Sequence, residues 1–392
     1  KGKKTARERL EALLDEGTKT RSSIAIAEEK ERLGVAIGAS ASMDRTSVGL
    51  TALTPNLVPS LDLFADILRN PAFVPAEIER VRAQQLAGIQ AELTSPQAIA
   101  MRALPVLLYG KAHPYGVPYT GSGDAAGVAR VTRKDMLAFK DRWLRPDNAQ
   151  IFVVSDAPLG DIVAALDASL GNWRGKGRKG VKDFTAPIPA PSPRIVLIDR
   201  PGSPQSMIVG GVVLGMDGRQ EMLDLIAAND VLGGDFLARM NMDLRETRGW
   251  SYGVRASVNR LIGRVPYIIS APVQADKTGP AIAALRDDMT AFLTDKGVSA
   301  EELERTISGS IRELPGSFET SGEVLGGVER NALYGRPDDY YDHLAGKYRA
   351  LTTADLDKAA RAAIDPSKMT WVVVGDAAKI RTQLDALGLP EE

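Results

Sequence analysis

Hydrophobic and polar residues follow the same order in two distant parts of the chain. The segments are VTRKDMLAFKDRWLRPDNAQIFVVSDA, residues 131–157, and LTTADLDKAARAAIDPSKMTWVVVGDA, residues 351–377, and they align without a gap. Each starts with a threonine suited to capping a helix, continues with helical spacing of apolar residues, and passes a proline into an apolar run. The pattern predicts one capped helix followed by one strand in each copy.

Two further pairs of segments repeat in the same order. Helices with early glutamates are predicted for VPAEIERVRAQQLAGIQ, starting at Val74, and for VSAEELERTISGSIREL, starting at Val298. A looser pair, residues 34–68 and 252–289, shows two alternating strands, a turn and an amphipathic helix in each copy. We therefore expect two copies of one α+β unit.

The predicted boundaries follow from a change of composition. Residues 1–180 form the first repeat, 181–193 a proline-rich linker within RGKGRKGVKDFTAPIPAPSP, and 194–392 the second repeat. Glycines, lysines and alternating prolines favour a semi-rigid connector, and the basic cluster lacks the interleaved aromatic residues of a nucleic-acid patch.

The start of the first repeat differs from the start of the second. A strand pair, RIVLIDRPGSPQSMIVGGVVLG at residues 194–215, opens the second repeat, whereas the first opens directly on a helix. We expect one hairpin to be missing from the first repeat, or to be supplied upstream. Because the chain begins at Lys1, we also expect either processing or a fragment.

Composition excludes several classes of function. Apolar residues at 44% and charged residues at 25% are typical of globular proteins, and a net charge of −1 gives no attraction to nucleic acid or anionic membranes. The absence of cysteine excludes disulfides and thiolate sites. It suits a reducing cytoplasm or a bacterial periplasm, so the compartment stays open. The first residues lack the apolar core of a secretory signal, and the run at 207–215 is too short to span a bilayer.

Residue patterns alone give no catalytic centre. The two histidines, His113 and His343, have no second histidine at metal-ligand spacing, and we expect packing or capping roles for both. No nucleophile elbow, phosphate-binding loop or dinucleotide fingerprint occurs. Paired carboxylates such as Glu301 and Glu302 lie in helix first turns, where the helix dipole explains them.

Five segments nevertheless resemble a known family in order and spacing. They are EGTKTRS, NPAFVPAEIERVR, HPYGVPYTG, VLGG and LRETRGWSYGV. Together they resemble the pitrilysin, insulin-degrading enzyme and mitochondrial processing peptidase family of zinc metallopeptidases, over nearly the whole chain. The resemblance implies an α+β fold of two homologous metallopeptidase-like α/β sandwich domains. Each is expected to be a mostly antiparallel sheet covered by helices, and the two to form half of a clam-shell.

The zinc ligands of that family are missing. Active members carry H-x-x-E-H on a helix, and the matching positions here are Glu8, Glu11 and Ala12, so only the glutamate remains, as Glu11. The further glutamate ligand is expected at Ala87 or Gly88 and is also replaced. Because a catalytic zinc takes three protein ligands, the resemblance implies no metal in this chain and zinc in a partner.

A second functional element of the family is present. In LRETRGWSYGV, Arg245 and Tyr252 match the pair that, in this family, reaches from the half without zinc toward the bound peptide. A guanidinium donates to peptide carbonyls, and a tyrosine hydroxyl donates to the oxygen on which charge develops. The resemblance also assigns substrate binding to Gly233 and Gly234. The alternative is structural, with Arg245 at a helix end and Tyr252 in an amphipathic strand.

The sequence therefore predicts the non-catalytic half of a zinc metallopeptidase, inactive alone, which positions unfolded peptide for an H-x-x-E-H-bearing partner subunit or half. No nucleic acid or membrane partner is expected. One alternative is a catalytically silent scaffold or peptide-binding module, like the core proteins of respiratory complexes. The other is an independent enzyme between the two repeats, which would require a carboxylate with a strongly shifted pKa in a closed pocket.

Overall fold

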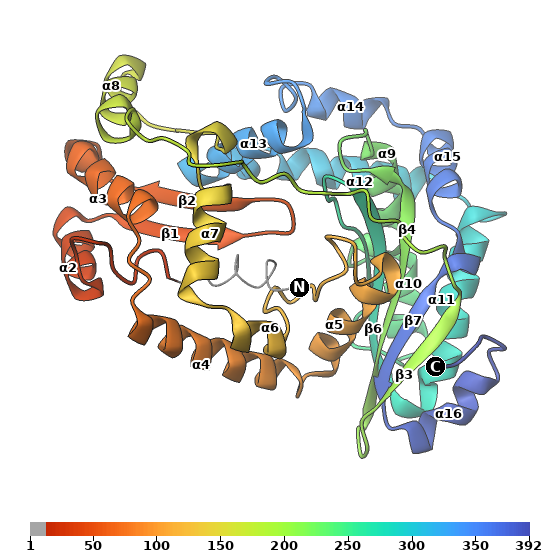
Figure 1. The fold of residues 1–392 in the computed structure, drawn as a ribbon. Helices are drawn as coiled ribbons and strands as arrows, with labels where there is room; N and C mark the ends of the chain where they lie inside the picture. Colours follow the sequence, from red (N-terminus) through yellow and green to blue (C-terminus); the bar gives the residue numbers. More distant parts are fainter. Residues whose placement is uncertain (1–12) are drawn as a thin grey trace. The chain divides into compact units, whose positions relative to one another are not determined.

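The computed structural model describes residues 13–392, which divide into two compact units (Figure 1). The first unit extends to Glu92 and resumes at 120–183, and the second contains 93–119 and 184–392. Helices and strands occur in both units, so the predicted α+β class is confirmed. The segment 93–119 packs with the second unit although it lies within the first predicted repeat. The predicted repeat boundaries, 1–180 and 194–392, therefore differ from the boundaries of the two compact units and remain a prediction.

In the first unit, helices pack against a two-stranded antiparallel sheet. The strands pair from Ala36 opposite Thr51 to Ala41 opposite Thr46. One apolar cluster joins side chains of α2, α3, α4 and α7 to Ile37 of β1. The elements are α2 (Ser23–Leu33), β1 (Ala36–Ala41), β2 (Thr46–Thr51), α3 (Leu57–Arg69), α4 (Pro75–Glu92), α6 (Ala125–Arg130), α7 (Arg133–Trp143) and α8 (Leu159–Leu170).

Two of the segments that carry the family resemblance meet in this unit. The backbone of Thr18 forms a bridge with Pro71, which joins EGTKTRS to NPAF. Asp66 of α3 accepts hydrogen bonds from Thr18 at 2.7 Å and from the Arg21 guanidinium at 2.5 Å. Burial raises the pKa of Asp66, but these and other side-chain hydrogen bonds outweigh it and lower the pKa overall. Local contacts that anchor the loop at residues 16–22 therefore account for the EGTKTRS motif.

The apolar segment at 149–155 is not the strand that the sequence predicted. Its backbone has no regular structure, and Ile151 and Val153 are 57% and 49% exposed. Its counterpart in the second repeat, β7 (Thr370–Gly375), is fully buried and pairs on both sides, with β3 and β4. The described part of the first unit holds no equivalents of those two strands. Without neighbours for its backbone groups, an apolar run gains little from extending as a strand.

The second unit contains a five-stranded sheet in the order β3-β7-β4-β6-β5. Only the pairing of β3 with β7 is parallel. The mostly antiparallel sheet expected for this unit is therefore confirmed. Its strands are β3 (Arg194–Asp199), β4 (Gln205–Asp217), β5 (Arg255–Val258), β6 (Arg264–Gln274) and β7 (Thr370–Gly375).

The two strands expected to pair as a hairpin in residues 194–215 do not form one. β3 and β4 are both present but do not pair with each other, because β7 lies between them. The six residues of β7 are all buried, and such a buried, mostly apolar strand gains most from an internal position covered on both faces. The interpretation of residues 194–215 as a simple hairpin is therefore wrong.

Helices cover both faces of this sheet (Figure 1). α5 (Pro96–Tyr109) packs against β4 and β7, where a side chain at Gly211 would meet Leu104 and Leu108 within 3.1 Å. α11 (Thr278–Leu293) packs against β4 and β6. Further helices are α9 (Leu223–Asn229), α10 (Arg239–Asn241), α12 (Ala300–Glu313), α13 (Ser321–Tyr334), α14 (Leu344–Ala350), α15 (Thr353–Ala363) and α16 (Ala377–Asp385).

Candidate peptide-positioning site

One segment of the second unit, residues 230–254, contains the residues assigned to peptide positioning and substrate binding. They are Gly233, Gly234, Arg245 and Tyr252. Two π-helical stretches, Asp230–Gly234 and Met242–Thr247, flank α10. Such stretches are rare and often mark functional sites, since the extra residue in each turn redirects side chains. In LRETRGWSYGV the helical stretch ends at Thr247 and Gly249 takes φ 65°, whereas β5 begins only at Arg255, after the motif.

Arg245 lies in the second π-helical stretch and remains partly exposed. Its guanidinium lies 4.6 Å from the centre of the Phe236 ring and 3.3 Å from the carboxylate of its neighbour Glu246. The other arginine of the motif, Arg248, instead makes a 2.7 Å ion pair with Asp243 and lies over Trp250. Of the two arginines, Arg245 is the one whose N–H groups are less committed to the protein.

Tyr252 is an exposed side chain on a fixed backbone. Its side chain is 83% exposed, and the residue precedes β5 instead of forming part of a strand. On one side Ser251 donates from its hydroxyl to the carbonyl of Pro272 at 2.6 Å, and on the other the N–H of Gly253 donates to that hydroxyl. Packing in an amphipathic strand therefore does not account for Tyr252.

The adjacent glycines are in crowded surroundings. A side chain at Gly233 would lie 2.6 Å from the Cβ of Ala256, and one at Gly234 would lie 2.5 Å from a carboxylate oxygen of Asp230. Close packing within the unit thus explains both glycines. Their role in substrate binding stays a prediction.

The structure adds exposed apolar residues that sequence reasoning missed. Phe236 and Leu237, which follow the glycines, are 59% and 45% exposed. Phe236 also carries the Arg245 guanidinium on its ring. The only sequence signal was their position one residue beyond VLGG, after Asp235, because an apolar pair looks the same in sequence whether it is buried or exposed.

A charged network holds α10 in place beside this surface. Arg239 makes two hydrogen bonds to Glu302 of α12, at 2.7 and 2.6 Å, and another to the carbonyl of Gly297. Burial acts to raise the pKa of Glu302, but hydrogen bonds from Arg239 and Ser299 lower it to about 2. Sequence reasoning assigned Glu302 to a helix first turn, and the structure adds its pairing with Arg239.

Two carboxyls of the second unit have raised pKa values. Burial, followed by repulsion from Asp235, raises the pKa of Asp230 to about 6. Burial and then repulsion from Asp243 raise the pKa of Asp288 to about 6. Such shifts occur in active sites and in structural networks alike, so geometry has to decide between them.

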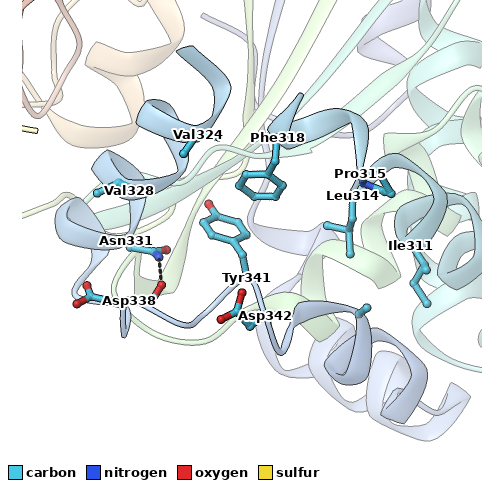
Figure 2. A pocket seen from close by; sticks show the side chains of 11 residues that line it. Ile311, Leu314, Pro315, Phe318, Val324, Val328, Asn331, Asp338, Tyr341 and Asp342 are labelled. Atoms are coloured by element: carbon cyan, nitrogen blue, oxygen red, sulfur yellow. Dashed lines mark hydrogen bonds between the residues drawn. The ribbon is translucent and has the colours of Figure 1, made fainter. Parts of the chain in front are cut away.

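A pocket elsewhere in the second unit holds neither of those carboxyls. It has a volume of about 520 Å³ and lies among α12, α13 and α14. Figure 2 shows Phe318 and Tyr341 facing each other within it, with ring centres 4.9 Å apart. Its polar residues are Asn331, two aspartates and Tyr341, without a histidine, lysine or serine. This lining offers no paired nucleophile and base, so it gives no support to an independent enzyme.

The metal-ligand positions do not fit zinc. Glu8, Glu11 and Ala12 lie outside the described residues, and their sequence provides no histidine. Ala87 and Gly88 are on the exposed part of α4 and carry no ligand atoms in their side chains. Within residues 13–392, no group of three or more histidine, cysteine, aspartate or glutamate side chains is arranged to hold a metal ion.

Both histidines are explained by local contacts. His113 is 2% exposed, stacks on Tyr109, and accepts a hydrogen bond from the backbone of Tyr115 through Nδ1. His343 lies at the start of α14, with Nε2 3.2 Å from Asp339. The predicted packing role is confirmed for His113. For His343 the expectation of packing or capping is wrong, because its side chain is 67% exposed and makes no capping hydrogen bond. Across the part of the chain that the structure describes, no helix combines the length and apolar character that a membrane crossing requires.

Two family models match the chain. Residues 9–114 match Insulinase (Peptidase family M16), and residues 130–310 match the Peptidase M16 inactive domain. The second match contains Arg245 and Tyr252, as well as both glycines of VLGG.

Individual proteins agree with these matches. The chain is 24% identical to an uncharacterized zinc protease of Mycobacterium tuberculosis, over 90% of this chain and 80% of that protein. It is 19% identical to a non-peptidase homolog of Helicobacter pylori, over 94% of this chain and 83% of that one. A peptidase M16 inactive domain from Pseudomonas fluorescens has a similar crystal structure, with a TM-score of 0.85 and 25% identity. That similarity covers 94% of this chain and 87% of the other.

Proposed function

Because the chain belongs to peptidase family M16, we propose that it is the non-catalytic half of a zinc metallopeptidase, which positions an unfolded peptide for a zinc-bearing partner. One observation carries the proposal. Arg245 and Tyr252, the pair expected to face the peptide, are both solvent-accessible side chains on a hydrogen-bonded backbone. Structural roles alone would favour burial of such a tyrosine.

The chemistry of the pair suits an extended peptide. Arg245 offers a planar set of N–H donors to peptide carbonyls, and the Phe236 ring beneath it restricts the positions of its guanidinium. The hydroxyl of Tyr252 is free to donate to a carbonyl oxygen as negative charge develops there. The exposed Phe236 and Leu237 add apolar surface for side chains of the peptide. We also propose that Gly233 and Gly234 serve substrate binding by keeping this loop compact.

Hydrolysis itself is assigned to the partner. A homologous subunit or half with H-x-x-E-H would hold the zinc, since the matching positions of this chain lack both histidines. The peptide would add as a strand to an exposed sheet edge of the partner, a mode that requires little sequence specificity. Closure over the peptide would exclude water and complete the site. Glu11 has no catalytic role in this scheme.

A silent scaffold is the second candidate function. The similarity to a non-peptidase homolog favours the scaffold, because that similarity extends over 94% of this chain. On this alternative, Arg245 and Tyr252 are inherited residues without a partner zinc site. A gene for an H-x-x-E-H homologue next to the gene of this chain favours the peptidase, and its absence favours the scaffold.

The test is peptide hydrolysis by this chain, by its H-x-x-E-H homologue, and by their mixture in the presence of zinc. We expect activity only in the mixture, with a loss on the order of 10²-fold for Arg245→Ala or Tyr252→Phe. Arg330→Ala and Tyr341→Phe are matched controls, since Arg330 also contacts an aromatic ring and hydrogen-bonds to Tyr341. Activity of the homologue alone, or a mixture indifferent to both site mutations, would favour the scaffold.

A further inference from the structure

The amide side chain of Asn241 is buried at the centre of the 230–254 segment. The residue is 3% exposed and ends α10. Its Nδ2 donates to the carbonyl of Phe236 at 2.6 Å, and its Oδ1 accepts from the N–H of Val254 at 2.9 Å. Both ends of one carboxamide are therefore bonded to backbone groups of two other parts of the segment.

These two bonds connect the elements that the proposed site requires. Phe236 carries the exposed ring on which the Arg245 guanidinium lies. Val254 is two residues after Tyr252 and is itself buried, so its N–H has no access to bulk water. Arg245 follows Asn241 by one helical turn, since α10 continues directly into the Met242–Thr247 stretch. The Asn241 side chain thus links the loop at Phe236 and the turn at 251–254 to the helical stretch that carries Arg245.

The position of Tyr252 depends on such backbone links because its side chain has few contacts of its own. With 83% of that side chain exposed, its location follows from the path of residues 251–254. Ser251 fixes one end of this path against β6, and Asn241 fixes the other. Loss of the Asn241 bonds would leave a buried N–H unpaired and release that end.

We propose that Asn241 is the positioning residue of this site, holding Phe236 and the Tyr252 turn in register with Arg245. The proposal rests on the proposed function, in which those side chains meet the peptide. Asn241 acts through its neighbours and does not itself contact substrate, because its amide is buried and both ends are already bonded. Two substitutions separate its bonds. Asn241→Leu removes both, whereas Asn241→Asp keeps the acceptor for Val254 and removes the donor to Phe236.

Asn331 provides a matched control in the same unit. It is 4% exposed, its Nδ2 donates to the carbonyl of Asp338 at 3.4 Å, and it lies in the pocket of Figure 2, outside the 230–254 segment. Asn331→Leu therefore reports the general cost of replacing a buried asparagine. Thermal unfolding of each variant shows how much of any effect comes from lost stability.

The first measurement is amide hydrogen exchange on the chain alone. We expect Asn241→Leu to speed exchange in residues 251–255 by at least about tenfold, with Asn241→Asp much milder there and Asn331→Leu without effect. The second is kcat and KM for fluorescein-labelled β-casein with the zinc-bearing homologue. Asn241→Leu should lower kcat/KM about tenfold, mainly through kcat, and this loss should largely disappear when Arg245→Ala and Tyr252→Phe are already present.

The outcomes separate the two proposals. A mixture without activity, or one insensitive to Arg245→Ala and Tyr252→Phe, defeats the proposed function. A mixture sensitive to those changes but not to Asn241→Leu defeats the positioning role alone. Unchanged exchange at 251–255 also defeats it, whether or not the mixture is active. Should Asn241→Leu fold poorly, Asn241→Asp still decides the question, because it should disturb the Phe236 loop and spare the Val254 amide.

Discussion

The ion pair between Arg239 and Glu302 gives a prediction that links stability to pH. Glu302 is part of the capping box of α12, where its carboxylate accepts from the N–H of Ser299 at 2.9 Å. The same carboxylate accepts two hydrogen bonds from Arg239 of α10. Glu302→Gln preserves the shape of the side chain and an acceptor for the cap, but it removes the charge that holds α10 to α12.

The expected loss follows from the pKa of the carboxyl. Hydrogen bonds from Arg239 and Ser299 outweigh burial and lower the pKa of Glu302 from 4.5 to about 2. Such a difference corresponds to at most roughly 3 kcal/mol of stability when the carboxyl is charged. Side-chain exposures of 26% for Arg239 and 16% for Glu302 allow solvent screening. We therefore expect Glu302→Gln to lower the free energy of unfolding by about 1–2 kcal/mol near neutral pH.

Urea unfolding across pH tests the reasoning. Because the folded pKa lies below the unfolded one, the stabilisation is complete above about pH 4.5 and is lost as pH falls toward 2. The gap between wild type and Glu302→Gln should shrink over that range. Glu301→Gln, at an exposed position of the same helix turn, is the control and should cost nearly nothing. A Glu302→Gln protein as stable as this control, or a gap that is undiminished at about pH 2, would refute the argument.

Two buried polar groups give further predictions for equilibrium unfolding. Tyr267 is fully buried and its hydroxyl has no hydrogen-bond partner among the described residues, so Tyr267→Phe should leave stability unchanged or raise it by up to about 1 kcal/mol. A clear loss would mean that the hydroxyl is bonded. Burial and repulsion from Asp243 raise the pKa of Asp288 from 3.8 to about 6, so stability is lost as pH rises between these two values and the loss is complete above about 6. Asp288→Asn should therefore stabilise the protein by about 1 kcal/mol near neutral pH, and the gain should vanish below about pH 4; a gain independent of pH would contradict this cause.

Local sequence signals predicted the helix starts and the membership of the family. The repeated threonine and aspartate at 132 and 135, and again at 352 and 355, form capping boxes at the predicted helices. These contacts lie within one helical turn, so the sequence determines them almost without regard to the rest of the fold. Arg245 and Tyr252 were singled out by the resemblance of LRETRGWSYGV to the family, whereas their exposure is a property of the fold.

The tertiary structure decided every feature that depends on distant partners. Two similar apolar runs became a buried central strand at 370–375 and an irregular exposed segment at 149–155, because only the first has strands on both sides. Likewise, no local pattern indicated that Asn241 joins Phe236 to Val254, or that Arg239 pairs with Glu302. A polar residue in a helical pattern looks solvent-exposed until packing buries it. Its hydrogen-bond partners are then set by which backbone groups the fold leaves unpaired at that point.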